Sequence, residues 1–574
     1  MQNQERENGG EQSSYISFSG TDSFRVTDYK NYTIEQAFAE AKGFIHFAFC
    51  ILHFAFSKGV AMLTNILQYL ESTAPRLPDK LAFSTGTEGL TFRELHTHAR
   101  TVGANLLRKG YYGEPVAVLM DKHPHTIATF FGVLYAGCFY AALDGDMPPA
   151  RMGLILDTLK PRLLIHDKKN AKTAGKLADE GIFGGDILCW DDLCYTEGRD
   201  LTATDEAALR AVRDRQIDTD PIYVVFTSGS TGVPKGVAAC HRSVIDYTES
   251  LCEAIGFDEN TVFANQTPLY FDAPLKEIMP TIKFGATAYL VPKMLFMFPV
   301  KLCEYLNEHR INTVCWVVSA LTMISSLGAL ESHTPKHLTT VCFGSEVFPR
   351  KQYDLWRAAL PEARFFNLYG PTEATGMSCY WPARDLAPDE PIPVGKPFRN
   401  TDLMLLTDDN RRAGIGEEGE ICLRGTCVTL GYYANPQKTS EAFVQNPLNP
   451  HYPEIIYRTG DIGRFNDRGE LVFVSRRDAQ IKHMGHRIEL GEIEAAAASA
   501  EGVRAACCVY DAGNKRIGLY YVGDTEPAAL TKALRAALPP YMIPAFCEKL
   551  SAMPLTPNGK VDRKGLRERA ENKE

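Results

Sequence analysis

Residues 221–236 (PIYVVFTSGSTGVPKG) combine the side-chain types that bind phosphate. Residues 222–226 form an apolar run typical of a buried strand, which leads into six consecutive Thr, Ser and Gly residues and then Lys235. Glycines let backbone N–H groups approach an anion, hydroxyls add donors, and lysine adds a mobile positive charge. The Walker A spacing is absent. These residues predict a nucleotide-phosphate loop of another type, with a solvated Ser/Gly turn as the alternative.

Further short motifs follow one another in a definite order along the chain. They are LTFREL (90–95), LYAGCFYAALD (134–144), NLYGPTEAT (367–375), GEICLRG (419–425), YRTGD (457–461), SRRDAQIKHMGHRIELGEIE (475–494), LPPYMIP (538–544) and NGKVDR (558–563). With the phosphate loop between the second and third, this series resembles the adenylate-forming superfamily of acyl- and aryl-CoA synthetases, luciferases and amino-acid adenylation domains. The resemblance extends from about residue 62 to the C-terminus, which a chance match of one motif would not do.

The resemblance implies that a carboxylate attacks the α-phosphate of ATP, giving an acyl-adenylate and pyrophosphate. Charge in such a transition state spreads over phosphoryl oxygens, so positioned cations and hydrogen-bond donors carry most of the catalysis. By this resemblance the β- and γ-phosphates are held by Thr227, Ser228, Gly229, Ser230, Thr231, Gly232 and Lys235.

Other nucleotide contacts are implied by the later motifs. Tyr369 would stack on adenine, Thr372 would contact the α-phosphate, and Glu373 would help to hold Mg²⁺, which prefers oxygen ligands. Asp461 would accept hydrogen bonds from the ribose hydroxyls, and Arg476 would make a second ribose or phosphate contact. The remaining ATP-binding positions are Gly344, Ser345, Asn367, Leu368 and Gly370.

Two C-terminal residues match positions that serve both half-reactions in this superfamily. Asp478 corresponds to the hinge about which a small C-terminal domain rotates. Lys560 resembles the lysine that bridges the substrate carboxylate and ATP. One departure precedes Arg476, where the family usually has glycine and this chain has Ser475. The implied catalytic residues are therefore Lys560, Thr372, Glu373 and Lys235.

Asp272, in YFDAP, indicates which acid is activated. Members of the superfamily that activate α-amino acids place an aspartate here to pair with the substrate ammonium, because a buried carboxylate without a cation is costly. The alternative is a solvated loop aspartate. The other implied substrate-binding positions are Ala273, Lys276, Trp316, Phe343, Leu368, Gly376, Met377 and Lys560.

The bulk of Trp316 and Phe343 predicts a small substrate side chain. Lys276 has two open interpretations: its ammonium reaches solvent along its stem, or it meets an acidic or polar substrate group.

The fate of the adenylate is also partly implied. The chain ends soon after Lys560, so we expect a separate carrier protein whose phosphopantetheine thiol accepts the aminoacyl group. The pattern resembles D-alanine–carrier protein ligases most, and free-standing adenylation proteins of nonribosomal peptide pathways almost equally. An acyl- or aryl-CoA ligase is the alternative that Asp272 disfavours. A catalytically silent binding protein is disfavoured by the complete motif series.

The elements that must position these residues follow from the hydrophobic pattern. Short β-branched runs alternate with helical patterns, which predicts parallel sheets covered by helices. A helix is expected from residue 62 until Pro75 and Pro78 end it. We expect a large α/β domain over 62–477 with a β-rich subregion near its end, and a small mobile α+β domain over 478–574, with substrates bound at their junction.

Composition excludes several classes of protein. The chain has 574 residues, of which 45% are hydrophobic and 23% charged, as in a globular protein. Its formal net charge of −9 argues against a general nucleic-acid binder. Its 15 cysteines form no CxxC pair, which favours reduced thiols in a cytoplasmic protein over disulfides or a zinc site.

The apolar run at residues 43–57 (GFIHFAFCILHFAFS) is too short to span a membrane, so no stable insertion is expected. It could be a peripheral membrane helix, a helix packed on the main body, or part of a leader over residues 1–61. We favour the leader, because the first recognisable helix begins at Met62.

Overall fold

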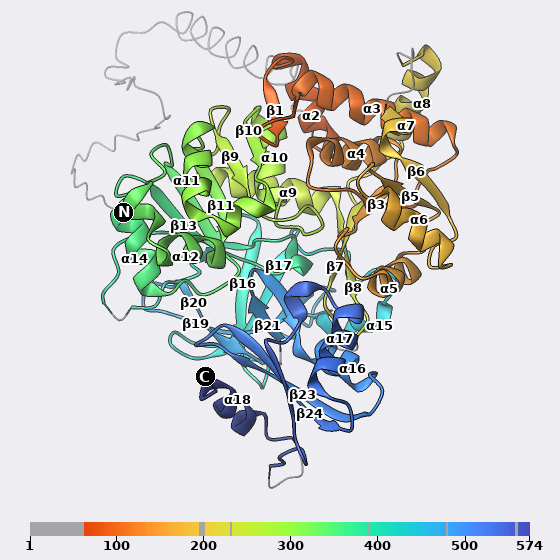
Figure 1. Ribbon diagram of the computed structural model, residues 1–574. Helices are drawn as coiled ribbons and strands as arrows, with labels where there is room; N and C mark the ends of the chain where they lie inside the picture. The colour runs from red at the N-terminus through yellow and green to blue at the C-terminus, as the bar shows by residue number, and fades with distance from the viewer. Residues whose placement is uncertain are drawn as a thin grey trace, which may run out of the picture. The chain divides into compact units, whose positions relative to one another are not determined.

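The computed structural model describes residues 62–194, 201–229, 232–388, 390–477, 480–556 and 561–573. Leu63–Glu574 forms one compact unit, whose elements are labelled in Figure 1. The predictions for residues 1–61, and those for Ser230, Thr231, Asp478 and Lys560, lie outside the described residues.

A six-stranded sheet of order β6-β5-β3-β4-β7-β8 ends at the phosphate loop. Its strands are parallel except β8, which runs antiparallel to β7, and helices alternate with the parallel strands as predicted. The strands are β3 (Pro115–Leu119), β4 (Phe139–Ala142), β5 (Leu163–His166), β6 (Asp186–Cys189), β7 (Pro221–Thr227) and β8 (Lys235–Cys240). The helices are α3 (Phe92–Arg108), α4 (Pro124–Tyr135), α5 (Pro149–Leu159), α6 (Ala171–Asp179), α7 (Trp190–Cys194) and α8 (Ala203–Arg213).

A nine-stranded sheet of order β15-β14-β13-β12-β11-β9-β10-β1-β2 supports the rest of the large region. Its strands are β1 (Leu81–Ser84), β2 (Gly89–Thr91), β9 (Val262–Asn265), β10 (Thr287–Leu290), β11 (Thr313–Val317), β12 (Thr340–Gly344), β13 (Arg364–Tyr369), β14 (Cys379–Pro382) and β15 (Lys396–Pro397). The associated helices are α2 (Leu67–Arg76), α9 (His241–Ile255), α10 (Leu275–Phe284), η1 (Lys293–Met297), α11 (Pro299–Glu308), α12 (Val318–Ser326), α13 (Ala329–Ser332), α14 (Arg350–Ala359) and η2 (Thr372–Ala374).

Successive residues of the central strands enter different cores. Trp316 and Phe343 pack with residues of α11, α12 and α14, which lie along one face of the sheet (Figure 1). Their neighbours Cys315 and Cys342 pack with residues of α9 and α10. This is the alternation expected of strands buried on both faces. The cysteines that the structure describes are all free thiols, and most are buried.

The predicted start of the first helix is wrong, because α2 begins at Leu67 and not at residue 62, whereas its end at Arg76, before Pro78, is as predicted. Pro75 lies inside α2, which continues to Arg76. A proline this close to the C-terminus removes a single helical hydrogen bond in a turn that is already ending, so it does not stop the helix.

The β-rich subregion and a smaller α+β region follow, as predicted. A five-stranded sheet contains β16 (Thr401–Leu406), β17 (Gly419–Gly425), β18 (Phe443–Gln445), β19 (Ile455–Phe465) and β20 (Leu471–Arg476). A hairpin of β21 (Gln480–His483) and β22 (His486–Glu489) precedes a three-stranded sheet of β23 (Val503–Asp511), β24 (Arg516–Gly523) and β25 (Phe546–Lys549). The helices here are α15 (Pro436–Ala442), α16 (Leu490–Ala498), α17 (Pro527–Ala537), η3 (Pro540–Met542) and α18 (Arg563–Glu571).

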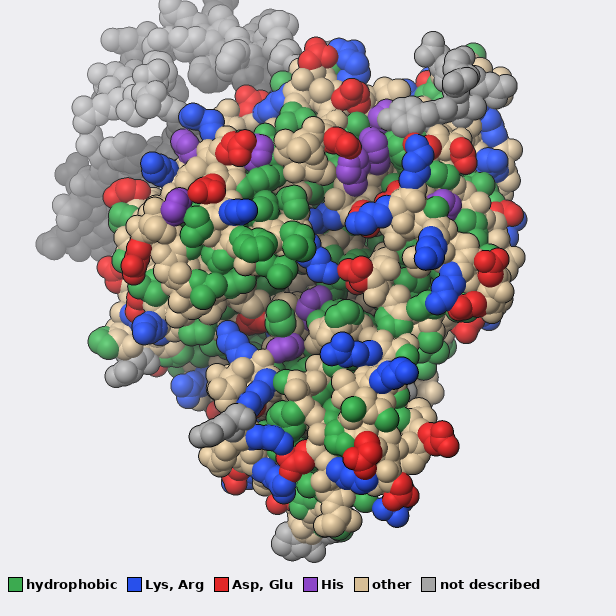
Figure 2. All heavy atoms as spheres, viewed as in Figure 1, with side chains coloured by type: hydrophobic (Ala, Val, Ile, Leu, Met, Phe, Trp, Pro, Cys, Tyr) green, Lys and Arg blue, Asp and Glu red, His purple; other side chains and the backbone are tan. Residues whose placement is uncertain are grey.

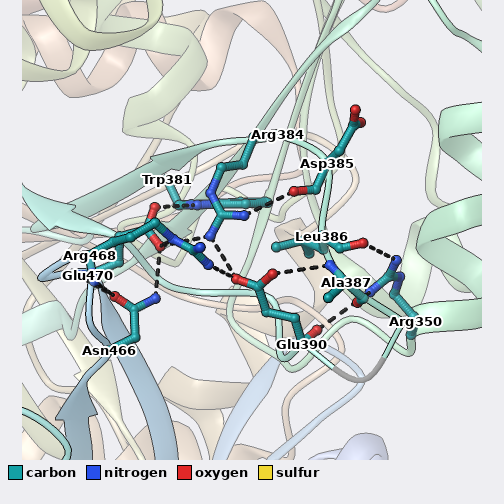
Figure 3. A network of polar contacts seen from close by, with 10 residues as sticks. All are labelled: Arg350, Trp381, Arg384, Asp385, Leu386, Ala387, Glu390, Asn466, Arg468 and Glu470. Carbon is teal, nitrogen blue, oxygen red and sulfur yellow. Dashed lines mark hydrogen bonds and ion pairs between the residues drawn. The ribbon is translucent and has the colours of Figure 1, made fainter.

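A polar network ties the β19–β20 turn to the segment after β14 (Figure 3). Glu470 accepts hydrogen bonds from Trp381 Nε1 (3.1 Å) and Arg384 Nη2 (3.0 Å), and Glu390 accepts from Arg384 Nη2 at 2.7 Å. Arg468 also pairs with Glu390. Burial opposes ionisation of Glu470, but these donors outweigh it and lower its pKa to about 2. The network therefore links the turn of the β19–β20 hairpin to the segment that follows β14.

Candidate functional site

The phosphate loop connects β7 to β8 as a tight turn with internal hydrogen bonds. Thr227 and Lys235 are paired across the two strands, and Gly232 N donates to Gly229 O at 3.0 Å. A Cβ atom on Gly229 would lie 2.0 Å from the carbonyl oxygen of Val233, so only glycine fits this turn. The described part of the loop is therefore a tight turn that requires glycine at position 229.

Residues from the β22–α16 segment occupy the donors of this loop. Gly229 N donates to Glu492 Oε2 at 3.2 Å, and Lys235 Nζ lies 3.6 Å from Glu489 Oε1. Arg151 pairs with the other oxygen of Glu492, and the two side chains are 5% and 1% exposed. Ser228 Oγ accepts from Glu489 N at 3.2 Å. The loop's positive potential is thus neutralised by two carboxylates of this chain.

The predicted nucleoside residues also meet one another. Tyr369 donates its hydroxyl to Asp461 Oδ2 at 2.6 Å, and Arg476 pairs with Asp461 Oδ1. Lys482 Nζ lies 5.6 Å from the centre of the Tyr369 ring. Burial lowers the pKa of Lys482, and Asp461 opposes that shift. Tyr369, Asp461 and Arg476, which the resemblance assigned to one nucleotide site, thus contact one another, whereas Lys482 was not singled out from the sequence.

Glu373 is fully buried and paired. Its Oε2 lies 2.7 Å from Arg487 Nη1, and its Oε1 accepts from the Tyr432 hydroxyl at 2.8 Å. Burial raises its pKa, but Arg487 and Lys235 outweigh burial and lower it to about 2. A lowered pKa favours the ionised carboxylate, which is the type of oxygen ligand that Mg²⁺ prefers. In this conformation, however, the Glu373 carboxylate is paired with Arg487. Among the described residues no group of His, Cys, Asp or Glu side chains forms a metal cluster.

A single cavity collects many of the predicted site residues. The predicted residues that line it are Thr227, Ser228, Asp272, Ala273, Ser345, Gly370, Thr372, Met377, Asp461 and Arg476. The face in Figure 2 is hollowed, and histidine and basic side chains lie along the hollow. The other described positions of the prediction do not line it: Gly229, Gly232, Lys235, Lys276, Trp316, Phe343, Gly344, Asn367, Leu368, Tyr369, Glu373 and Gly376. Gly229 and Lys235 line a second cavity instead.

Asp272 differs from the other carboxylates of the site. Its Oδ2 is shielded from solvent and has no hydrogen-bond partner among the described residues. Burial raises its pKa, with the Thr372 hydroxyl and Lys276 opposing the shift. A Cβ on Gly376 would lie 3.6 Å from this oxygen, which leaves room beside it. One oxygen of this cavity-lining carboxylate therefore has no hydrogen-bond partner among the described residues.

The other predicted specificity residues have different surroundings. Lys276 is only 3% exposed, so the interpretation that it reaches solvent is wrong, and it forms no ion pair with the described residues. Trp316 donates Nε1 to Ala264 O at 2.6 Å, and Phe343 packs on Phe348. Neither aromatic side chain lines the cavity, because strand alternation turns both toward α11, α12 and α14. They do not narrow it as predicted.

Several wall residues were not singled out from sequence. Phe271 and Tyr541 line the cavity, and His486 behind them contacts both rings, stacking on Tyr541 at 3.7 Å between ring centres. Lys482, Gly485 and Arg487 belong to the β21–β22 hairpin, inside the quoted 475–494 motif, so that motif was the available signal. Arg151 follows no motif, and no sequence signal pointed to it.

Comparisons with known proteins agree with this geometry. A family model described as AMP-binding enzyme matches residues 70–433. Phosphinothricin tripeptide synthetase PhsC of Streptomyces viridochromogenes is 35% identical over 505 residues, covering 87% of this chain and 44% of that protein. Tyrocidine synthase 1 of Brevibacillus parabrevis is 30% identical over 512 residues, covering 88% of this chain and 45% of that protein. The chain thus spans less than half the length of these relatives.

A solved structure has the same fold. NpsA-ThdA, an artificially fused adenylation-PCP di-domain from Klebsiella oxytoca, superposes with a TM-score of 0.72 at 22% identity, covering 86% of this chain and 94% of that one. In the part of this chain that the structure describes, no helix is both long and apolar enough to cross a membrane. The matched family model, the colinear motifs and the assembled cavity show that this chain belongs to the AMP-binding enzyme family of the adenylate-forming superfamily.

Proposed function

We propose that this chain activates an amino acid as its adenylate. A substrate carboxylate oxygen attacks the α-phosphorus of ATP, a new P–O bond forms, and the bond to pyrophosphate breaks. The phosphopantetheine thiolate of a separate carrier protein then attacks the acyl carbon, so that a thioester forms and AMP leaves. Membership of the AMP-binding family supports the first step.

Asp272 is the observation that carries the amino-acid assignment. Its partnerless Oδ2 lies in the same cavity as Thr372, the residue expected at the α-phosphate. A buried carboxylate is stabilised by a cation, and a substrate α-ammonium supplies one at the required place. An acid without an amino group would leave Asp272 Oδ2 without a hydrogen-bond donor, which disfavours acyl- and aryl-CoA ligase chemistry.

We assign the proposed contacts with the phosphates and the ribose of ATP to the following residues. Gly229 N–H, Ser228 and Lys235 bind the β- and γ-phosphates, Asp461 with Arg476 binds the ribose, and Thr372 binds the α-phosphate. Glu373 offers an oxygen to Mg²⁺ once Arg487 leaves it, and the bound ion would neutralise phosphate charge. Lys560 remains proposed as the lysine that bridges the carboxylate and ATP.

Lys276 carries no preference for a substrate side chain. It does not line the cavity, and its charge acts on the buried carboxyls of Asp272 and Glu277. The acceptor remains a carrier protein in trans, as the sequence resemblance implied.

ATP–pyrophosphate exchange with a panel of D- and L-amino acids tests this function. We expect exchange with at least one amino acid. Exchange supported only by carboxylic acids that lack an amino group would overturn the proposal in favour of a CoA ligase. The variant Lys560→Ala should lose exchange while ATP binding persists.

A further inference from the structure

A third cavity lies at the opposite end of the nine-stranded sheet from the candidate site. The wall of the candidate site includes Thr267 and Val317, at or just beyond the carboxyl ends of β9 and β11. The third cavity, of about 510 Å³, is lined by Leu81, Val262 and Thr287, the first residues of β1, β9 and β10. Because these strands are parallel and β11 is five residues long, roughly 16 Å of sheet separates the two cavities.

We call the third cavity the basic cavity, because four basic side chains line it: Lys80, His309, Arg310 and His337. No Asp or Glu belongs to the part of its wall that the structure describes. The whole chain has a formal net charge of −9, so the sign of the charge in this cavity is opposite to that of the protein. A concave site lined by charge of one sign concentrates ions of the other sign. The ligand that fits this cavity is therefore an anion.

The two permanent cations of the basic cavity are not neutralised by carboxylates on its wall. Arg310 is exposed, and its guanidinium forms no hydrogen bond or ion pair with another described residue. Lys80 Nζ donates to the backbone oxygen of Glu259, whose carboxylate accepts from Arg76 at 3.0 Å. Neither Glu259 nor Glu308 lines the cavity. Both cations are therefore able to pair with a bound anion.

Arg310 also has an unusual backbone conformation. Helix α11 ends at Glu308, and two residues later Arg310 has φ of 51°, in the left-handed region where helix ends usually carry glycine. This conformation is strained for a residue with a Cβ atom. Strained conformations of this kind are concentrated at functional sites. An arginine at this position therefore indicates a role for its guanidinium that glycine could not fill.

An aromatic wall adjoins these cations. The rings of Tyr289 and His309 are stacked with their centres 4.4 Å apart, and Tyr305 packs edge-on against His309 at 4.3 Å. A Cβ atom on Gly86 would lie 3.1 Å from His309 Nε2, so glycine lets the backbone pack closely against this imidazole. The cavity volume is in the usual range for small-molecule sites. A flat wall beside two cations suits a ligand that has both a planar ring and an anionic group.

We propose that the basic cavity binds a small molecule that carries both a phosphate group and a planar ring. Arg310 and Lys80 pair with the phosphate oxygens, since guanidinium and ammonium groups are the usual phosphate-binding cations of proteins. Tyr289 and His309 contact the ring. Two cations match the two negative charges of a phosphomonoester better than the single charge of a carboxylate. The inference does not rest on the proposed function, because none of these residues lines the candidate site.

Titration calorimetry of the full chain with phenyl phosphate, phenyl sulfate and inorganic phosphate tests this site. Phenyl sulfate has the same ring with a single negative charge, whereas inorganic phosphate has the charge without the ring. We expect phenyl phosphate to bind most tightly. Phenyl sulfate should bind roughly 10-fold more weakly, since hydrogen bonds between charged groups contribute strongly. Inorganic phosphate should bind roughly 2- to 10-fold more weakly, the usual contribution of a ring contact.

The variant Arg310→Gly removes the guanidinium and also relieves the backbone strain. Its affinity for phenyl phosphate should fall roughly 10-fold or more, while its thermal unfolding midpoint should stay constant or rise. Loss of binding by a protein that is at least as stable cannot come from misfolding. Its affinity for ATP should stay unchanged, which places the loss outside the phosphate loop.

Lys515→Gly is the matched control. Lys515 is exposed in the β23–β24 turn and has φ of 50°, so this variant loses the same charge and relieves the same strain. Its affinity for phenyl phosphate should equal that of the wild type. Tyr289→Leu tests the aromatic wall, and it should reduce the affinity for phenyl phosphate to that for inorganic phosphate.

The outcomes that contradict the proposal are distinct. Failure of the wild type to bind either phosphate would overturn it, as would equal losses in Arg310→Gly and Lys515→Gly, which would indicate a general effect of charge. Equal affinities for phenyl phosphate and phenyl sulfate would overturn the recognition of a phosphate group. Equal affinities for phenyl phosphate and inorganic phosphate would overturn the recognition of a ring and assign the cavity to inorganic phosphate.

Discussion

The phosphate loop and Asp272 both contribute to the wall of one cavity, but they differ in whether their polar groups have partners within the protein. At the loop, the chain's own carboxylates Glu489 and Glu492 meet the donors Lys235 and Gly229 N. In the second region, Asp272 Oδ2 has no hydrogen-bond partner among the described residues. One region is complete without its ligand, whereas the other is incomplete.

The contrast indicates how each substrate would be recognised. A ligand of the loop must displace internal ion pairs, so its affinity reflects a competition between anions. A ligand of Asp272 meets a carboxylate that is already desolvated, so a cation there gains interaction energy without displacing a protein group. Nucleotide binding is thus expected to be tunable by the β22–α16 segment, and amino-acid recognition by a single side chain.

Asp272→Asn should produce the largest effect. Loss of the carboxylate leaves a substrate ammonium without its partner, and breaking a buried pair costs about 3–5 kcal/mol. We expect kcat/KM for the amino acid in pyrophosphate exchange to fall roughly 100-fold or more. ATP affinity should stay within about twofold, because the loop contacts are untouched.

A nearby aspartate provides the control for this variant. Asp146 pairs with Lys293, and its side chain is 67% exposed. Asp146→Asn should leave exchange unchanged, since exposed pairs contribute little. Wild-type exchange by Asp272→Asn would show that Asp272 does not bind the substrate ammonium, and the contrast between the two regions would then be wrong.

Gly485→Ala should have the next largest effect, measured as the free energy of unfolding. Gly485 lies at the hairpin tip with φ of 80°, and a Cβ there would lie 2.8 Å from Val317 Cγ1. Gly469 has a similar φ of 67° but open space around it. Both alanine variants incur about 1–2 kcal/mol of backbone strain, and overpacking adds about 1–3 kcal/mol for Gly485 alone. Equal destabilisation of the two variants would show that the hairpin tip is not tightly packed against Val317 of β11.

Tyr432→Phe should be milder and act on the nucleotide side. It removes a 2.8 Å hydrogen bond to the ionised Glu373, and bonds to charged groups contribute about 1.5–3 kcal/mol. Tyr433 is the matched neighbour, because its hydroxyl makes only a 3.5 Å contact with Leu159 O. Chemical denaturation should show a clear loss for Tyr432→Phe and a smaller one for Tyr433→Phe. The reverse order would mean that Glu373 is not held by Tyr432.

The smallest effect concerns pH. Burial raises the pKa of Asp272, so its proton returns at a higher pH than for an ordinary aspartate. Only the ionised form pairs with an ammonium, so KM for the amino acid should rise as pH falls from 7 toward 4, by at most about tenfold per pH unit. Glu373, with a pKa of about 2, stays ionised over this range. The dependence should disappear in Asp272→Asn, and its persistence there would assign it to another group.

Much of the fold and part of the site were predictable because their signals are local. Alternating apolar runs indicated the parallel strands, and the capping box of Thr91 with Glu94 in LTFREL begins α3. The contact between Gly229 and Glu492 joins residues 263 apart, and no local pattern specifies it. The orientation of Trp316 was missed for a related reason, since a strand buried on both faces gives no periodicity that tells its two sides apart.

Amino-acid discrimination is tested most directly by the wild-type enzyme with matched substrates. Pyrophosphate exchange would be measured with an amino acid that the enzyme accepts and with the same acid lacking only its amino group. Pairing of the ammonium with Asp272 predicts kcat/KM at least roughly 100-fold higher for the amino acid, because the deaminated acid leaves a buried carboxylate unpaired. Equal values, or a preference for the deaminated acid, would contradict the assignment of Asp272 and with it the proposed function.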